Sequence, residues 1–181
     1  MPLPPVGDHL IILLMDVPEA KFFRACIGAF PGRRFRRAAS LRDLRRHLKG
    51  APPAVRIISF CSPIIVPHDV LRTYPGQCFN FHPGPPEFPG FRPSRLAVAS
   101  NARSFGVTFH TMVERVDAGP IHGVRRFAVP MGTTRADLDV LTYGALAELA
   151  HNLAGPLGNM HHRFTSSGDR WGSSVPGEQP G

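Results

Sequence analysis

Short apolar runs alternate with amphipathic segments along most of this chain. Runs with apolar residues predict strands at 10–15, 55–60, 77–82, 106–113 and 121–129, and the segment 33–38, rich in Arg, predicts a weak strand. Apolar residues at helical spacing predict helices at about 16–30, 40–49, 68–73, 93–101 and 133–153. Short strands that alternate with helices are typical of an α/β fold. We therefore expect an open, Rossmann-like sheet that is mostly parallel and carries helices on both faces.

Polar residues mark several of the expected helix starts. Asp16 precedes the first helix, Ser40 with Asp43 opens the second, and Thr133 or Thr134 caps the last. A side-chain oxygen at this position accepts a hydrogen bond from a free backbone N–H of the first turn. These residues therefore indicate where the helices begin.

Length and composition bound the domain organisation. A chain of 181 residues with 43% hydrophobic residues has room for one domain with a sizeable core. From about Thr165 the composition turns to Ser, Gly and Pro, which bury little apolar surface. We expect one domain over residues 1–164 and a disordered tail over residues 165–181.

Cysteine content and hydropathy favour a cytoplasmic protein. Cys26, Cys61 and Cys78 are odd in number and lie among apolar neighbours, which favours buried, reduced thiols. The longest apolar run, 10–15, is far too short to span a bilayer. No basic segment precedes this run as it would in a signal peptide. We therefore expect no membrane contact.

Much of the formal net charge of +8 is concentrated early in the chain. In the segment 40–49, basic residues lie on one helical face and leucines on another. The basic residues are Arg42, Arg45, Arg46 and Lys49, and the leucines are Leu41, Leu44 and Leu48. Such a basic face is either solvated or attracts an anionic acceptor or partner. Nucleic acid is not an expected partner, because no aromatic stacking motif accompanies the charge.

Candidate chemistry lies at the ends of two predicted strands. Asn80 and His82 are two residues apart, so they point to the same face of a strand that leads into a Pro- and Gly-rich loop, 83–90. Asp117 follows the strand 106–113 in a turn of small residues. Taken singly, each residue has an ordinary structural role, as a hydrogen-bonding amide, a core histidine or a turn former. Together, an amide, an imidazole and a carboxylate at strand ends are suited to acyl transfer.

These two segments resemble the motifs of the folate-dependent formyltransferases. The family includes the glycinamide ribonucleotide and methionyl-tRNA formyltransferases, and its pattern is Asn-x-His-Pro followed by Gly-Val-Thr-x-His and Asp-x-Gly-x-Ile. The matching residues are Asn80, His82, Pro83, Gly90, Gly106, Val107, Thr108, His110, Asp117, Gly119 and Ile121. Gly84 stands where the family often has Ser, which allows closer backbone approach. The resemblance covers residues 9 to about 154 and implies that the domain 1–164 is a catalytic domain with the formyltransferase-type fold.

The resemblance implies a role for each site residue. His82 is expected to donate a hydrogen bond to the oxyanion that forms when an amine attacks the formyl carbon. Asn80 is expected to hold the formyl oxygen and the incoming amine. Asp117 is expected to pair with His82 or an ordered water and to carry protons toward the leaving nitrogen. His110 is expected to support the acid through a hydrogen bond.

The resemblance also implies a cofactor. The expected co-substrate is 10-formyltetrahydrofolate, and the segment 62–66 matches the backbone that brackets its pterin ring. The expected cofactor-binding residues are Ser62, Ile64, Ile65, Val66 and Val116. A turn between a strand and a helix offers a flat heterocycle apolar walls and backbone hydrogen-bonding groups. No metal is expected, because the histidines near the tail lack a Cys, Asp or Glu at ligand spacing.

The acceptor is predicted only by class. The loop after the first strand, 15–20, has no Gly and two acids, whereas a phosphate cradle needs free backbone donors. A phosphoribosyl acceptor is therefore not expected, and a small-molecule amine remains, with neither its identity nor the oligomeric state assigned. Two alternatives stay open. One is a formyltetrahydrofolate hydrolase, in which water replaces the amine, and the other is a catalytically silent module that binds folate or a partner.

Overall fold

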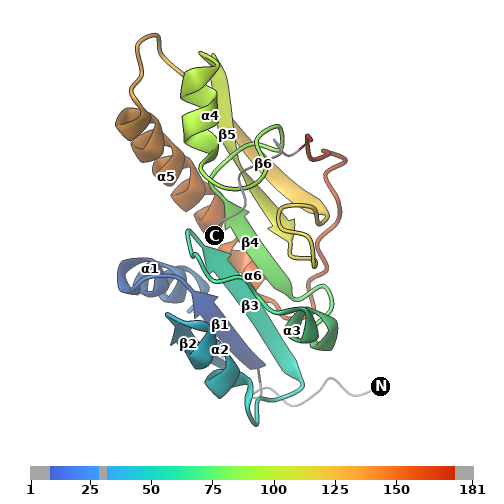
Figure 1. Cartoon of the computed structure of the whole chain (residues 1–181). Coiled ribbons are helices and arrows are strands. Elements are labelled where there is room, and N and C mark those ends of the chain that lie inside the picture. Colours follow the sequence, from blue (N-terminus) through green and yellow to red (C-terminus); the bar gives the residue numbers. More distant parts are fainter. Residues whose placement is uncertain (1–8, 29–31, 174–181) are drawn as a thin grey trace. The chain divides into compact units, whose positions relative to one another are not determined.

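Figure 1 shows the computed structural model of the chain, which describes residues 9–28 and 32–173. Within the chain, two compact units can be distinguished. Of the described residues, the first unit contains 9–28, 32–79 and 151–164, and the second contains 80–150 and 165–173.

Six strands of the described chain form an open sheet. They are β1 (His9–Leu14), β2 (Arg33–Ala38), β3 (Ala54–Phe60), β4 (Cys78–His82), β5 (Ser104–Thr111) and β6 (Ile121–Ala128). The strand order is β2-β1-β3-β4-β5-β6, with β1 parallel to both β2 and β3 and with β5 antiparallel to β6. The predicted Rossmann-like, mostly parallel sheet is confirmed, and each predicted strand lies within a few residues of its expected place.

Helices connect the strands in the predicted order (Figure 1). They are α1 (Val17–Ile27), α2 (Leu41–Leu48), α3 (His68–Thr73), α4 (Pro93–Ala99), α5 (Arg135–Asn152) and α6 (Ala154–Gly158). The sequence did not predict α6, because its five residues include two Gly and one Pro, the poorest helix formers. The expected end of the first helix near residue 30 falls outside the described residues. None of the described helices is both long and apolar enough to cross a bilayer.

Side-chain caps begin α2 and α5 as predicted. Ser40 Oγ accepts a hydrogen bond from the Asp43 N–H at 3.1 Å. Thr134 Oγ1 accepts from the Asp137 N–H at 3.2 Å, and Asp137 Oδ2 accepts from the Thr134 N–H at 3.2 Å. Asp16 occupies the capping position before α1, but its side chain makes no capping hydrogen bond. The predicted cap at Asp16 is therefore wrong, although the helix begins where it was expected.

The core of the first unit forms around β1. Every residue of β1 is buried, and β2 and β3 flank it on both edges. Phe23 of α1 meets Phe60 of β3 edge-on, with the ring centroids 5.5 Å apart. A parallel strand covered on both faces has no solvent side, which explains why β1 is continuously apolar rather than alternating.

The basic face of α2 is exposed and partly balanced by acids of the same unit. Arg45 donates hydrogen bonds to both oxygens of Asp69, at 2.8 and 3.1 Å. Arg46 donates to Asp43 at 2.7 Å. Leu44, on the opposite face of the helix, is buried. At least part of the predicted basic face is therefore paired within the unit rather than unbalanced.

Arg56 of β3 is the largest fully buried side chain among the described residues. Its guanidinium donates to Gln77 Oε1 through Nε and Nη2, at 3.0 and 2.9 Å. It also donates to the carbonyl oxygens of Pro156, Leu157 and Asn159, at 3.1, 2.8 and 3.1 Å. Carbonyls at the end of a helix lack partners within it, so Arg56 satisfies the end of α6. The predicted apolar strand at 55–60 thus contains a charged anchor that the pattern did not reveal.

Arg56 keeps its charge despite its burial. Burial, and then repulsion from Arg163 and Arg33, lowers the pKa of Arg56 to about 10. The guanidinium is therefore protonated at neutral pH and can use its donors on the surrounding oxygens.

Residues 165–173, the described part of the predicted tail, make several contacts within the second unit. The Ser167 N–H donates to the Ile121 carbonyl at 2.8 Å, beside the start of β6 (Figure 1). Trp171 is half-buried in the same unit. Composition averages over a segment and does not reveal such single contacts. Residues 174–181 lie outside the described residues.

Replacing Arg56 by Met should lower the free energy of unfolding by about 3–5 kcal/mol, as for other buried charge networks that lose one member. Met has a similar length but no donor, so Gln77 Oε1 and the carbonyls at the end of α6 would be left buried and unpaired. Urea unfolding followed by circular dichroism measures the change. The exposed Arg72, changed to Met, is the matched control and should shift stability by at most about 0.5 kcal/mol. An equally small effect of Arg56→Met would contradict the anchoring role.

Candidate active site

The end of β4 presents Asn80 and His82 on one face of the strand. His82 is buried, with 3% of its surface exposed, and Asn80 is half-buried. Phe81, between them, packs against Phe109 of β5 with ring centroids 4.7 Å apart. Because side chains alternate along a strand, Phe81 packs on one face and fixes the position of β4, while Asn80 and His82 lie on the other face and are available for polar contacts.

Asp117 lies in the turn between β5 and β6 with a left-handed backbone, at φ 45°. Asp adopts this conformation more readily than most residues because its short polar side chain can bond locally. Gly119 follows in the same turn, where an added Cβ would collide with the Thr111 carbonyl oxygen. This tight turn directs the Asp117 side chain inward, and only 4% of that side chain is exposed.

The Asp117 carboxylate is surrounded by donors. Oδ2 lies 3.1 Å from His82 Nδ1 and accepts a hydrogen bond from the Gly90 N–H at 2.9 Å. Oδ1 lies 3.2 Å from His110 Nε2. His110, in turn, has Nε2 3.2 Å from the Asn80 amide nitrogen and Nδ1 2.9 Å from the Thr111 carbonyl. Asn80, His82, His110 and Asp117 thus form one continuous polar network within the second unit.

These donors keep Asp117 ionised. Burial by itself would raise the pKa of this carboxyl. The hydrogen bonds from His110 and His82, together with the charge of both rings, outweigh the effect of burial and hold the pKa of Asp117 well below its ordinary value. Asp117 is therefore a fixed negative charge at neutral pH and only a weak proton acceptor.

Both ring nitrogens of His82 face acceptors. Nδ1 faces the Asp117 carboxylate, and Nε2 lies 3.0 Å from the Phe88 carbonyl oxygen. Carboxylate and carbonyl oxygens only accept, so a ring nitrogen of His82 that carries a hydrogen can donate to either of them. His82 is therefore held between the Asp117 carboxylate, at Nδ1, and the loop 83–90, at Nε2.

The loop 83–90 approaches His82 closely because residue 84 is glycine. A Cβ at this position would lie 2.7 Å from His82 Nε2 and 2.7 Å from the Cβ of Pro93. Thr108 Oγ1 donates to the Gly84 carbonyl at 2.8 Å and ties the loop to β5. Glycine at position 84 therefore has a steric consequence: a larger residue here would move the loop or the His82 ring.

Trp171 is a neighbour of this network that the sequence did not predict. Its indole ring lies nearly perpendicular to the rings of His82 and His110, with centroids 5.6 and 4.9 Å away. The available signal was its presence as the only Trp of the chain within a Ser- and Gly-rich segment. Large aromatic side chains usually bury much of their surface, so an isolated Trp in such a segment indicates packing.

The predicted cofactor-binding residues differ in accessibility. Ser62, Ile64, Ile65 and Val66 follow β3 in the first unit, and Val116 precedes Asp117 in the second. Ile65 and Val116 are 58% and 54% exposed, so their aliphatic surfaces are accessible to a ligand. Val66 is buried in the core, and Ser62 Oγ accepts a hydrogen bond from the Ile64 N–H at 3.3 Å.

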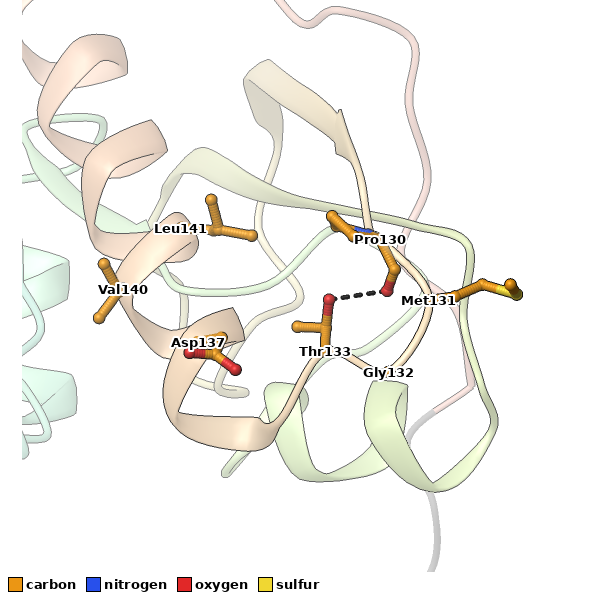
Figure 2. Close-up of a pocket in the computed structure, with 7 residues that line it drawn as sticks. All are labelled: Pro130, Met131, Gly132, Thr133, Asp137, Val140 and Leu141. Carbon is orange, nitrogen blue, oxygen red and sulfur yellow. Dashed lines mark hydrogen bonds between the residues drawn. The ribbon is translucent and has the colours of Figure 1, made fainter.

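A separate hollow of about 460 Å³ lies where β6 leads into α5 (Figure 2). Its lining residues are Pro130, Met131, Gly132, Thr133, Asp137, Val140 and Leu141. Thr133 Oγ1 donates to the Pro130 carbonyl at 2.7 Å and closes the turn (Figure 2). None of the predicted site residues lines this hollow. Among the residues that the structure describes, no three His, Cys, Asp or Glu side chains are grouped to hold a metal ion.

The polar network is suited to reactions in which a carbonyl oxygen gains negative charge. An imidazole N–H can stabilise that charge, and the adjoining carboxylate orients the ring. The Asn80 amide adds a second polar group at the edge of the network. Proton transfer to or from a bound nitrogen would use the same imidazole.

Solved structures with the same fold include several formyltransferases. A sugar N-formyltransferase from Shewanella sp. FDAARGOS_354 matches with a TM-score of 0.75 at 17% identity, over 92% of this chain and 76% of that chain. A formyltransferase from Anoxybacillus kamchatkensis matches with a TM-score of 0.74 at 17% identity, over 92% of this chain and 85% of that chain. Phosphoribosylglycinamide formyltransferase from Anaplasma phagocytophilum matches with a TM-score of 0.64 at 15% identity, over 90% of this chain and 94% of that chain.

A family model for formyl transferases matches residues 19–147, which is well over half of the chain. The matched range contains Asn80, His82, His110 and Asp117. Sequence and fold therefore agree, and this chain belongs to the formyl transferase family.

Proposed function

We propose that this chain transfers the formyl group of 10-formyltetrahydrofolate to an amine of a small-molecule acceptor. The observation that carries the proposal is the buried network of Asn80, His82, His110 and Asp117 in a chain of the formyl transferase family. When bound, 10-formyltetrahydrofolate supplies the formyl carbon and leaves through its N10 atom. A carbon–nitrogen bond forms at the acceptor and another breaks at N10, while one proton passes from the acceptor amine to N10.

His82 is the proposed donor to the formyl oxygen. Its Nε2–H is directed at the Phe88 carbonyl, 3.0 Å away, so the formyl oxygen would take the place of this acceptor when substrate binds. The Phe88 carbonyl in the loop 83–90 must therefore move away from His82 Nε2 during turnover. A preorganised donor of this kind contributes about 2.7–4 kcal/mol to the stabilisation of a developing oxyanion.

Asp117 is proposed to act through His82 rather than as the first proton acceptor. Its pKa lies well below the ordinary value because of the hydrogen bonds and charge of the two imidazoles, so it takes up a proton poorly. We propose that protons pass between the acceptor nitrogen and N10 through His82 or water, and that the fixed charge of Asp117 stabilises the imidazolium. Asn80, at the edge of the network, is proposed to orient the formyl oxygen and the amine.

The residues proposed to contact the pterin are Ser62, Ile64, Ile65, Val66 and Val116. The exposed side chains of Ile65 and Val116 support this assignment, because a flat heterocycle needs accessible apolar surface. The backbone around Ser62 and Ile64 offers the polar groups that such a ring also requires. Val66, which is buried, would contribute through its main chain.

An amino sugar is the first acceptor class to test. The Anoxybacillus kamchatkensis enzyme was crystallised with UDP-4,6-dideoxy-4-formamido-L-AltNAc and tetrahydrofolate. The Helicobacter canadensis enzyme was crystallised with folinic acid and dTDP-3-aminofucose. Incubation of this chain with 10-formyltetrahydrofolate and nucleotide-linked amino sugars should yield tetrahydrofolate and a formylated product, detected by absorbance and mass spectrometry. Formate release without acceptor would instead identify a hydrolase, and folate binding without turnover a silent binding module.

Replacing His82 by Ala should lower kcat by about 10²–10³-fold, the loss typical of one oxyanion donor. Asp117→Asn should lower kcat by at least about 10²-fold, because it preserves shape but removes the charge that orients the imidazole. Steady-state kinetics with saturating folate measures both effects. Circular dichroism establishes that each variant remains folded.

The matched control is His161→Ala, since His161 is exposed and lies outside the network. Its kcat should equal that of the wild type. Near-wild-type turnover by His82→Ala would exclude the donor role, and near-wild-type turnover by Asp117→Asn would exclude the charge effect.

Asp117 should stabilise the fold at neutral pH but not in strong acid. Its folded-state pKa is depressed, so its contribution is fully present above the unfolded value of about 3.9 and is lost as the pH falls toward the folded value. The difference in unfolding free energy between wild type and Asp117→Asn should therefore shrink steadily below about pH 4. Urea unfolding between about pH 5 and pH 3 measures this difference, with the exposed Asp139→Asn as control. A difference that stays constant or grows over this range would contradict the assigned pKa direction.

A further inference from the structure

Residues 165–173, here called the C-terminal strap, lie against the polar network within the second unit. The strap starts beside β6, where the Thr165 carbonyl accepts a hydrogen bond from His122 Nδ1 at 2.9 Å. It ends at the loop 83–90, where the Gly172 N–H donates to the Pro86 carbonyl at 2.8 Å. An added Cβ on Gly172 would lie 3.1 Å from the Glu87 carbonyl oxygen, so the approach to this loop is close. The strap therefore runs from one side of the network to the other.

Trp171 makes the strap's contact with the network itself. Its indole ring lies 4.9 Å from the His110 ring and 5.6 Å from the His82 ring, at interplanar angles of 85° and 78°. Its Nε1–H donates to the Gly119 carbonyl at 2.8 Å, two residues beyond Asp117. Trp171 thus contacts both imidazoles and the turn that carries the acid.

Trp171 and its neighbour Gly172 link two loops that are separate in the sequence. One is the loop that follows His82, reached through the Pro86 carbonyl, and the other is the turn that holds Asp117, reached through the Gly119 carbonyl. The distance between His82 Nδ1 and Asp117 Oδ2, 3.1 Å, depends on how these two loops lie. A large apolar ring beside the pair also excludes water, which strengthens the electrostatic interaction between the two groups.

We propose that Trp171 is a positioning residue for the formyl transfer proposed above, on which this inference rests. Trp171 holds the His82 and His110 rings in the orientation that directs them at Asp117. It also excludes water from the contact between His82 and Asp117. It touches neither the formyl group nor the acceptor. Its effect is therefore expected in the chemical step rather than in substrate binding.

Kinetics of two Trp171 variants test this role. Trp171→Ala removes the ring and should lower kcat by about 10- to 100-fold, because small displacements of catalytic groups are costly, with the KM for 10-formyltetrahydrofolate within about 3-fold of wild type. Trp171→Phe keeps a ring against the imidazoles but loses the Nε1–H, and it should recover kcat to within about 5-fold of wild type. If Trp171→Ala does not fold, Trp171→Leu takes its place, since Leu is apolar but has no ring. Ser173→Ala, at an exposed position of the same strap, is the matched control and should leave both constants unchanged.

A second measurement does not depend on turnover. Nitrogen-15 NMR of the histidine rings reports which nitrogens of His82 and His110 carry protons. Trp171→Ala should shift or average these signals, whereas Trp171→Phe and Ser173→Ala should leave them as in the wild type. If the wild-type chain transfers no formyl group, the proposed function fails, and this spectrum still tests the positioning of the rings.

Three outcomes would overturn the inference. An unchanged kcat together with unchanged ring signals in Trp171→Ala would show that the strap only links the two loops and does not position the rings. A raised KM with unchanged kcat would show that Trp171 contacts substrate. A raised kcat would show that the strap obstructs the site instead of ordering it.

Discussion

A buried carboxylate is the constraint on which the second unit depends. Asp117 has only 4% of its side chain exposed, and a charge so placed would be strongly destabilising without partners. His82, His110 and the Gly90 N–H supply those partners at 3.1, 3.2 and 2.9 Å. The ends of β4 and β5 and the loop 83–90 must all lie close together to supply the partners of this one carboxylate. The contacts that suit the network for acyl transfer are therefore also those that hold the unit together.

The first unit meets a similar requirement with the opposite charge. Arg56 is fully buried on β3 and is surrounded by Gln77 and the carbonyls at the end of α6. It bears no relation to the proposed chemistry, because its acceptors are structural oxygens with no acid among them. Burial and a shifted pKa are thus poor guides to function when taken alone. What distinguishes Asp117 is that its partners are two imidazoles and that an amide adjoins them.

Close backbone approach decides how the site is closed. Gly84 allows the loop 83–90 to reach within contact of His82, and Gly119 allows the turn after Asp117 to pass the Thr111 carbonyl. The left-handed backbone of Asp117 itself belongs to the same tight geometry. In addition, the Trp171 ring lies against the rings of His82 and His110. A segment with the composition of a disordered tail therefore contacts the candidate site.

The sequence by itself determined the strands, most of the helices and two of the caps, and it singled out Asn80, His82, His110 and Asp117 as candidate site residues. Those features are encoded locally, by hydrophobic periodicity, by cap residues within one turn, and by short motifs at the strand ends. Only the tertiary structure decided which atoms of His82 and Asp117 face each other. It also decided that Arg56 anchors α6 and that Trp171 lies beside the two imidazole rings. The Arg56 and Trp171 contacts join positions 100 and 52 residues apart, and no local pattern records such pairs. Long-range packing alone brings them together, since a side chain's partners depend on where the rest of the chain has folded.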